Sequence, residues 1–75
     1  MEFNQALDAR GLNCPLPILR TKKALGTLSS GQVLQVTSTD PGSVKDMQAF
    51  ARQTENELLS TAEAAGEFVF YLKRH

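Results

Sequence analysis

The pattern of this 75-residue sequence predicts an α/β (α+β) two-layer sandwich, in which a four-stranded mixed sheet carries two helices on one face. Segments with helical periodicity and segments with strand-like alternation follow one another in the order βαβαββ. A helix between the first two strands favours their parallel pairing, and a short turn between the last two favours an antiparallel hairpin. The length corresponds to a single domain, 1–75, with a small core.

The first half of the pattern is a short strand followed by a helix. Residues 3–9 are expected to form the strand, and residues 15–28 the helix. Gly26 weakens the last turns of this helix, because glycine is a poor helix former. The buried stripe of the helix recurs at spacings of three and four, at Ile18, Thr21, Leu25 and Leu28.

Residues 32–39 are the clearest strand, because they are rich in β-branched residues and contain no glycine or proline. Two starts are possible for the second helix. Asp40 can cap it, or Ser43 can cap it with Asp46 three residues on. The helix is expected to run to about residue 54. Its inner face is formed by Val44, Met47, Phe50 and Ala51.

Two further strands, 57–63 and 67–73, are joined by a turn at Ala65-Gly66. In the last strand the apolar side chains alternate between the two faces. Its phenylalanines and Phe50 fit a core better than a platform for stacking RNA bases, because no RNA-binding or Gly-rich phosphate motif accompanies them.

The composition excludes several classes of protein. Eight basic and eight acidic residues cancel, so no overall field attracts nucleic acid or a membrane surface. The first residues lack the pattern of a signal peptide, and no apolar run approaches the roughly 20 residues that span a bilayer. One cysteine allows no disulfide framework, which fits the reducing cytoplasm. With His75 as the one histidine, no metal site or cofactor is expected. We expect a monomer.

The stretch Gly11–Pro17 contains the one cysteine of the chain and two of its three prolines. Pro15 fits the first position of a helix, where a missing N–H costs nothing, so Cys14 would be the N-cap. The positive end of the helix would then lower the pKa of the thiol and favour the reactive thiolate. Because Pro17 also lacks an N–H, the Leu16 N–H would be the remaining donor to the sulfur. The alternative is that Cys14 is a buried core cysteine.

The segment Leu7–Pro17 resembles the signature of the TusA (SirA-like) sulfur-carrier family, whose hallmark is Cys-Pro-x-Pro after a first strand. The likeness continues at Asp40-Pro41-Gly42-Ser43 with Asp46, and at Asn56-Glu57-Leu58-Leu59, so it covers nearly the whole chain. Many relatives carry a second cysteine after the phenylalanine of the second helix, where this chain has Ala51. The resemblance implies the same two-layer sandwich, with Cys14 as the carrier residue and Pro15, Leu16 and Pro17 as the supporting motif.

The resemblance also implies a function. A sulfurtransferase-type carrier takes a sulfane sulfur as a persulfide on its cysteine from a cysteine desulfurase or a rhodanese-like donor. It then relays the sulfur to an acceptor protein that serves tRNA thiolation, cofactor assembly or sulfur metabolism. The chemistry is nucleophilic exchange at sulfur, and no complete turnover is expected without partners.

Three other functions compete with the sulfur carrier. A dithiol oxidoreductase is disfavoured, because a resolving cysteine is absent. A nucleic-acid binder is disfavoured by the zero net charge. A non-catalytic interaction or regulatory module, in which Cys14 is incidental, stays open.

Charged residues near the motif suggest where a partner docks. Between Ala9 and Thr39 the chain has no acidic residue and four basic ones, Arg10, Arg20, Lys22 and Lys23. They are either a docking patch beside Cys14 or a solvated helix face. Asp8 and Arg10 either order the cysteine loop or form an ordinary surface pair. The remaining carboxylates near helix ends, expected to be caps and solvated side chains, are Asp40, Asp46, Glu55 and Glu57.

Overall fold

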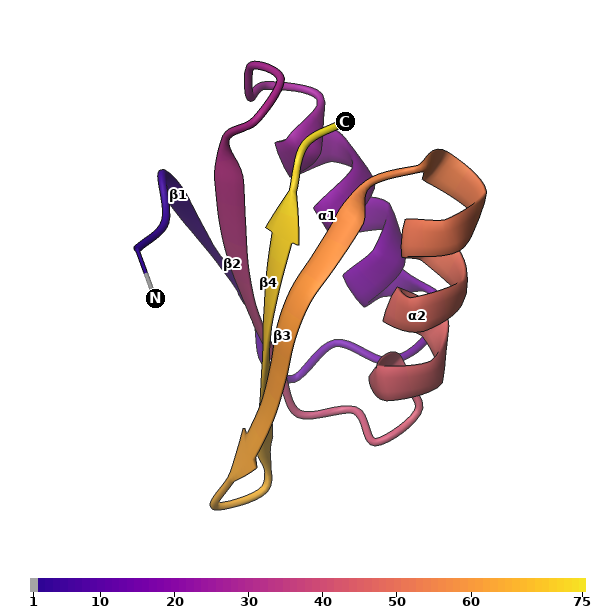
Figure 1. Ribbon diagram of the computed structural model, residues 1–75. Helices are drawn as coiled ribbons and strands as arrows, with labels where there is room; N and C mark the ends of the chain where they lie inside the picture. The colour runs from indigo at the N-terminus through magenta and orange to yellow at the C-terminus, as the bar shows by residue number, and fades with distance from the viewer. Residues whose placement is uncertain (1) are drawn as a thin grey trace.

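The computed structural model describes residues 2–75 and shows one four-stranded sheet with two helices on one face (Figure 1). The strands lie in the order β1-β2-β4-β3. β1 and β2 are parallel, and the other two pairs are antiparallel, which confirms the predicted mixed sheet and its hairpin. The elements are β1 (Gln5–Ala9), α1 (Leu16–Leu25), β2 (Val33–Ser38), α2 (Ser43–Thr54), β3 (Glu57–Ala64) and β4 (Glu67–Lys73).

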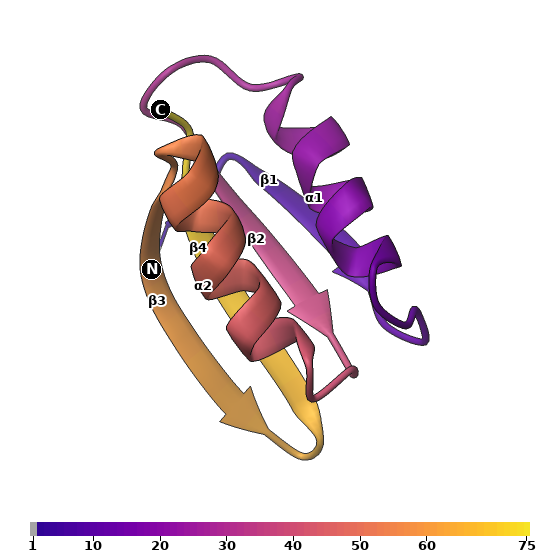
Figure 2. The ribbon, with the colours of Figure 1, turned by 90° about the vertical axis from the view of Figure 1, so that its right-hand side faces the viewer.

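The core lies between the sheet and the two helices. α1 packs on β1 and β2, whereas α2 packs on β4 and β3 (Figure 2). Alternate side chains of β2 and β4 point into this layer, which confirms the predicted alternation of the last strand and the core role of its phenylalanines. Each large apolar side chain buried here contributes about 1.5–3 kcal/mol. The largest of those that are fully buried are Phe70, Leu34, Met47, Leu72 and Val36.

The predicted stripe of α1 is buried only in part. Thr21 and Leu25 are buried together with Ala24, and Ile18 and Leu28 are half-buried against the edge of the core. The Thr21 hydroxyl donates to the backbone carbonyl of residue 17, at 2.7 Å, so it is buried without losing a hydrogen bond. The sequence pattern predicts that this helix ends at residue 28, but α1 ends at Leu25.

Both predicted helix starts are wrong by one or more residues. Helix α1 begins at Leu16, and its N-cap is Pro15 and not Cys14. Helix α2 begins at Ser43 with Gly42 as its N-cap, so neither Asp40 nor Ser43 caps it with a side chain. The reason is that the Asp40 carboxylate accepts the backbone N–H groups of Cys14 and Gly42.

Candidate functional site

The loops after β1 and β2 meet at one end of the sheet, because the two strands run parallel (Figure 1). Two hydrogen bonds tie these loops together. The Gly11 N–H donates to the Thr39 hydroxyl at 2.9 Å, and the Cys14 N–H donates to an Asp40 carboxylate oxygen, also at 2.9 Å. The start of α2 therefore helps to fix the backbone of the cysteine motif.

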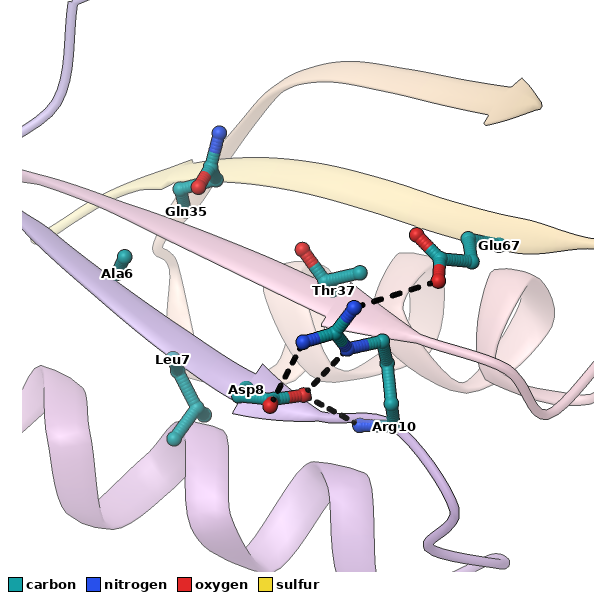
Figure 3. Close-up of a pocket in the computed structure, with 7 residues that line it drawn as sticks. All are labelled: Ala6, Leu7, Asp8, Arg10, Gln35, Thr37 and Glu67. Carbon is teal, nitrogen blue, oxygen red and sulfur yellow. Dashed lines mark hydrogen bonds and ion pairs between the residues drawn. The ribbon is translucent and has the colours of Figure 1, made fainter. Parts of the chain in front are cut away.

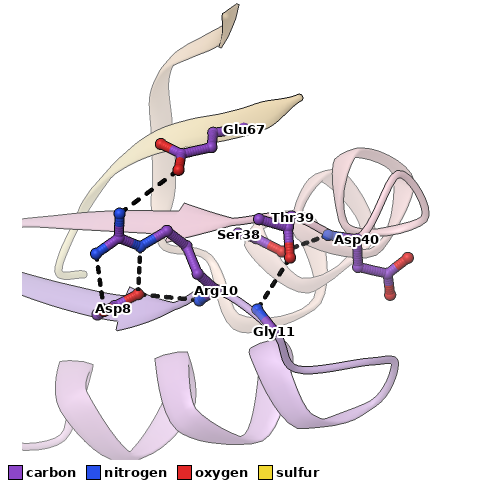
Figure 4. A network of polar contacts seen from close by, with 7 residues as sticks. All are labelled: Asp8, Arg10, Gly11, Ser38, Thr39, Asp40 and Glu67. Carbon is purple, nitrogen blue, oxygen red and sulfur yellow. Dashed lines mark hydrogen bonds and ion pairs between the residues drawn. The ribbon is translucent and has the colours of Figure 1, made fainter. Parts of the chain in front are cut away.

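The carboxylate, the backbone N–H and the backbone carbonyl of Asp40 all form hydrogen bonds. One of its carboxylate oxygens, Oδ1, accepts the Gly42 N–H at 3.0 Å. Its own N–H donates to the Ser38 hydroxyl at 3.2 Å (Figure 4). Its carbonyl oxygen accepts both the N–H and the hydroxyl of Ser43, at 3.0 and 2.6 Å. Because its carboxylate bridges Cys14 and Gly42, Asp40 connects the cysteine loop to the first turn of α2.

Cys14 is exposed, so the alternative of a buried core cysteine is wrong. It lies just before Pro15, the N-cap of α1. The Leu16 N–H, the expected donor to the sulfur, donates instead to the Asn13 carbonyl at 2.8 Å. Pro17 has no N–H to offer. The start of α1 therefore does not provide the donors that were expected to stabilise a thiolate.

Two carboxylates act on the thiol of Cys14. A hydrogen bond to the Asp46 carboxylate raises the pKa of Cys14 above its usual value, and partial desolvation and the negative charges of Asp46 and Asp40 raise it further. The prediction of a lowered pKa is therefore wrong. The sequence pattern predicts both aspartates to be caps or solvated residues, and this prediction misses their effect on the thiol. The parallel pairing of the first two strands was the signal that places residues 14 and 40 at the same end of the sheet.

Arg10 belongs to a separate ion-pair cluster with Asp8 and Glu67, on the sheet face away from α1 (Figure 3). Its Nε and Nη2 donate to the two carboxylate oxygens of Asp8, at 2.9 and 3.1 Å, and its Nη1 approaches Glu67 at 3.5 Å. The backbone N–H of Arg10 also donates to Asp8, at 3.0 Å. These bonds from Arg10 lower the pKa of Asp8 to about 2. The surface-pair interpretation accounts for this contact, with Glu67 as a member that sequence reasoning missed.

The other basic residues lie on two flanks of α1. Arg20 and Lys23 line a surface groove of about 520 Å³ between α1 and β1. Lys22 lies on the other flank, in a smaller depression shared with Phe50 and Arg74. The four basic residues therefore do not form one continuous patch.

Two leucines of α1 stand out as exposed apolar side chains beside the cysteine motif. Leu16 is 43% exposed and Leu19 is 54% exposed. In the described part of the chain, no group of three or more His, Cys, Asp or Glu side chains is placed to hold a metal ion. Neither of the two helices has the length and hydropathy needed to cross a bilayer.

Comparison with known proteins places the chain in a family. A family model described as sulfurtransferase TusA matches residues 5–74. The sulfur carrier protein TusA of Allochromatium vinosum is 63% identical over 73 residues, which are 97% of this chain and 96% of that protein. A putative sulfur carrier protein of Neisseria meningitidis serogroup A is 47% identical over 70 residues, covering 93% of this chain and 95% of the relative.

A solved structure shares the fold. The crystal structure of a SirA-like protein from Desulfitobacterium hafniense superposes with a TM-score of 0.83 at 26% identity, over 93% of this chain and 96% of that one. The two-layer arrangement of the sheet and the helices is therefore that of the SirA-like neighbour. With the matches in sequence, this likeness shows that the chain belongs to the TusA sulfurtransferase family.

Proposed function

We propose that this protein is a sulfur carrier that holds a sulfane sulfur as a persulfide on Cys14 and relays it to an acceptor protein. The observation that carries the proposal is the place of the one cysteine, which is exposed at the junction between β1 and α1. Its relatives of similar length are named sulfur carrier proteins. Pro15, Leu16 and Pro17 support the site by starting α1 directly after the sulfur.

The transfer needs no cofactor and no net oxidant. The Cys14 sulfur attacks the outer sulfur of a donor persulfide, the new S–S bond forms, and the S–S bond of the donor breaks. The electron pair of the broken bond leaves on the donor cysteine, which takes up the proton that Cys14 gives up. A raised pKa reduces the thiolate fraction of Cys14 but makes that thiolate a stronger nucleophile. The protein thus acts as a sulfurtransferase only together with its partners.

The partners are defined by this chemistry. The donor is a cysteine desulfurase or a rhodanese-like protein, both of which present a persulfide. The acceptor is a downstream protein of tRNA thiolation, cofactor assembly or sulfur metabolism. A free thiol of this kind persists in a reducing compartment, which supports a location in the cytoplasm.

The experiment is a loading assay. We expect that incubation with a cysteine desulfurase and free cysteine adds the mass of one sulfur atom to the protein, and that Cys14→Ser adds none. Circular dichroism of Cys14→Ser checks that the fold is kept, because an exposed thiol contributes little to packing. The carrier proposal fails if the wild-type protein takes up sulfur from neither a desulfurase nor a rhodanese-type donor. A non-catalytic module would keep its partner binding in Cys14→Ser.

We also propose that partners dock on α1. A partner that reaches the Cys14 sulfur must cover the start of this helix, where Leu16 and Leu19 offer an apolar centre. Arg20 and Lys23 on one flank and Lys22 on the other lie at the rim of this surface. Charges at the rim mainly raise the association rate and make it sensitive to salt. Arg10 contributes least, since Asp8 and Glu67 already neutralise it.

Charge reversal tests the docking surface. Arg20→Glu with Lys23→Glu should slow sulfur transfer from the donor and reduce its sensitivity to salt, while a small neutral alkylating agent reacts with Cys14 as before. Arg52→Glu with Lys73→Glu is the matched control, because it reverses two charges away from the cysteine, at the ends of α2 and β4. Equal transfer rates in the two double variants would show that the basic flank is only a solvated face.

A further inference from the structure

The two edges of the sheet, β1 and β3, are built differently (Figure 2). β3 has a bulge between Leu58 and Ser60 and carries two glutamates. β1 pairs with β2 in an unbroken register along its five residues. Bulges and charged side chains are devices that keep an exposed edge from pairing with another strand. β3 has both devices, whereas the one charged residue of β1, Asp8, is paired with Arg10.

The outer side of β1 presents backbone groups that can pair with a further strand. The Asn4 N–H donates to the Val33 carbonyl at 2.8 Å, so it points toward β2. Because the backbone groups of a strand alternate between its two sides, those of Gln5 and Leu7 point away from the sheet. Within residues 2–75 β2 is the one strand that pairs with β1, so this side is open to a strand of another molecule.

A groove with two cations lies beside this edge. Its volume is about 520 Å³, and it lies between α1 and β1. The half-buried Leu7 and the buried Ala24 contribute apolar surface to it. Arg20 and Lys23 also line it, both are exposed, and neither forms an ion pair within the described residues 2–75. The edge of β1 is therefore flanked by positive charge that the described chain does not pair.

We infer that β1 and this groove bind an extended acidic segment of a partner protein, which joins the sheet as a strand beside β1. The backbone of the segment bonds to the outward groups of Gln5 and Leu7. Its side chains alternate between the two faces of the sheet. Those on the helix face lie next to Arg20 and Lys23, which favours acidic residues at alternate positions. Those on the other face lie beside Asp8, which disfavours further acidic residues there (Figure 3).

The charges argue against a second copy of this chain as the occupant. Two copies that paired through β1 would bring Arg20 and Lys23 of both to one junction, where like charges repel. An acidic segment complements these two residues instead. The inference names the chemistry of the partner that docks beside α1. It rests on the proposed carrier function only for the expectation that this partner takes part in sulfur transfer.

A peptide that alternates glutamate with valine, blocked at both ends, tests this binding. In an NMR titration of the whole protein we expect the amide signals of Gln5 and Leu7 to shift most and their hydrogen exchange to slow. Lysine in place of glutamate should weaken binding at least about tenfold, because attraction to two cations becomes repulsion. Methylation of the amide nitrogens of the peptide should weaken it about two- to tenfold for each hydrogen bond lost.

Variants of the protein give matched controls. Gln5→Pro removes one outward N–H from an edge position, where proline is tolerated, and should weaken binding of the glutamate peptide. Gln5→Ala keeps that N–H and should bind as wild type does, and circular dichroism checks both folds. Arg20→Glu with Lys23→Glu should also weaken binding. Arg52→Glu with Lys73→Glu reverses two charges that do not line the groove and should not.

The inference is overturned if the glutamate peptide leaves the Gln5 and Leu7 amides unshifted, or if the lysine or methylated peptide binds as tightly. Sedimentation of the protein alone tests the other occupant. A dimer that Gln5→Pro dissociates would assign the edge to a second copy and overturn the inference as well.

The peptide assay is independent of sulfur loading. Cys14→Ser should bind the glutamate peptide as wild type does, because the sulfur is not part of this edge. Peptide binding by a protein that takes up no sulfur would support the edge site while the carrier function fails. Sulfur loading by a protein that does not bind the peptide would leave the carrier function standing and overturn the edge site.

Discussion

Two groups of carboxylates differ in whether a cation is paired with them. Figure 4 shows the ion pairs of Arg10 in the first group and, near them, Asp40 of the second. In the first, the Arg10 guanidinium spans Asp8 and Glu67 and lowers the pKa of Asp8 to about 2. In the second, Asp46 and Asp40 raise the pKa of Cys14, and neither forms an ion pair within residues 2–75. The carboxylates of one cluster are paired with an arginine of the protein, whereas those of the other have no such partner within that range and act on the thiol.

The difference shows which charged residues can change the chemistry of their neighbours. Charges that are paired on the surface contribute little to stability and do not change the chemistry around them. Charges that remain unpaired shift the pKa values of neighbouring groups, and such shifts concentrate at functional sites. The cysteine cluster also has a structural role, because Asp40 uses both carboxylate oxygens to hold backbone N–H groups.

The largest expected effect comes from breaking this structural role. Asp40→Ala removes the acceptor of the Cys14 and Gly42 N–H groups, and we expect it to lower the free energy of unfolding by about 1–3 kcal/mol. Unfolding in urea, followed by circular dichroism, measures the change. Hydrogen exchange at the Cys14 amide should become faster as well.

Asp40→Asn is the matched variant for this prediction. It removes the charge but keeps one carbonyl oxygen, which can still accept one of the two N–H groups. We therefore expect a smaller loss of stability than in Asp40→Ala. Equal stability of wild type and Asp40→Ala would mean that the bridge between the two loops contributes nothing to the fold.

Local patterns in the sequence were sufficient to predict the fold. The alternation along β4 and the β-branched run of β2 identify strands, and the parallel pair follows from the helix between the first two strands. Cys14 could be chosen because it is the one cysteine and lies at a strand-to-helix junction. These features depend on residues that are close in the sequence.

The surroundings of the sulfur could not be predicted in the same way. Asp40 is 26 positions away from Cys14, and whether its side chain caps α2 or binds the cysteine loop is decided by the tertiary structure. The Leu16 N–H was expected to face the sulfur, but the turn that begins at Asn13 uses it. The sign of the pKa shift therefore depended on contacts that no local pattern contains.

The second prediction concerns the reactivity of the thiol. Asp46→Asn removes the charged partner of the thiol, so the pKa of Cys14 should fall. The rate of alkylation by a small neutral reagent should then rise at neutral pH by up to about fivefold, and its midpoint should move to lower pH. Glu57→Gln should leave the profile of rate against pH unchanged. A midpoint that stays fixed in Asp46→Asn would show that another feature, such as desolvation, raises the pKa of Cys14.

The smallest expected effect belongs to the cluster that contains Arg10. The pKa of Asp8 is about 2 in the folded protein and 3.8 when unperturbed, so the ionised carboxylate favours the folded state. This stability is fully present above the unperturbed pKa and is lost as the pH falls through about 2. Asp8→Asn has no carboxylate to titrate, so we expect its disadvantage to shrink over this acid range and to be reduced by salt at neutral pH. Urea unfolding of both proteins from neutral to acidic pH measures the effect.

Because Asp8 is exposed and lies in the cluster that does not act on the thiol, the alkylation profile of Cys14 should be the same in both. A changed profile would mean that the two clusters are coupled, and the contrast between them would not hold.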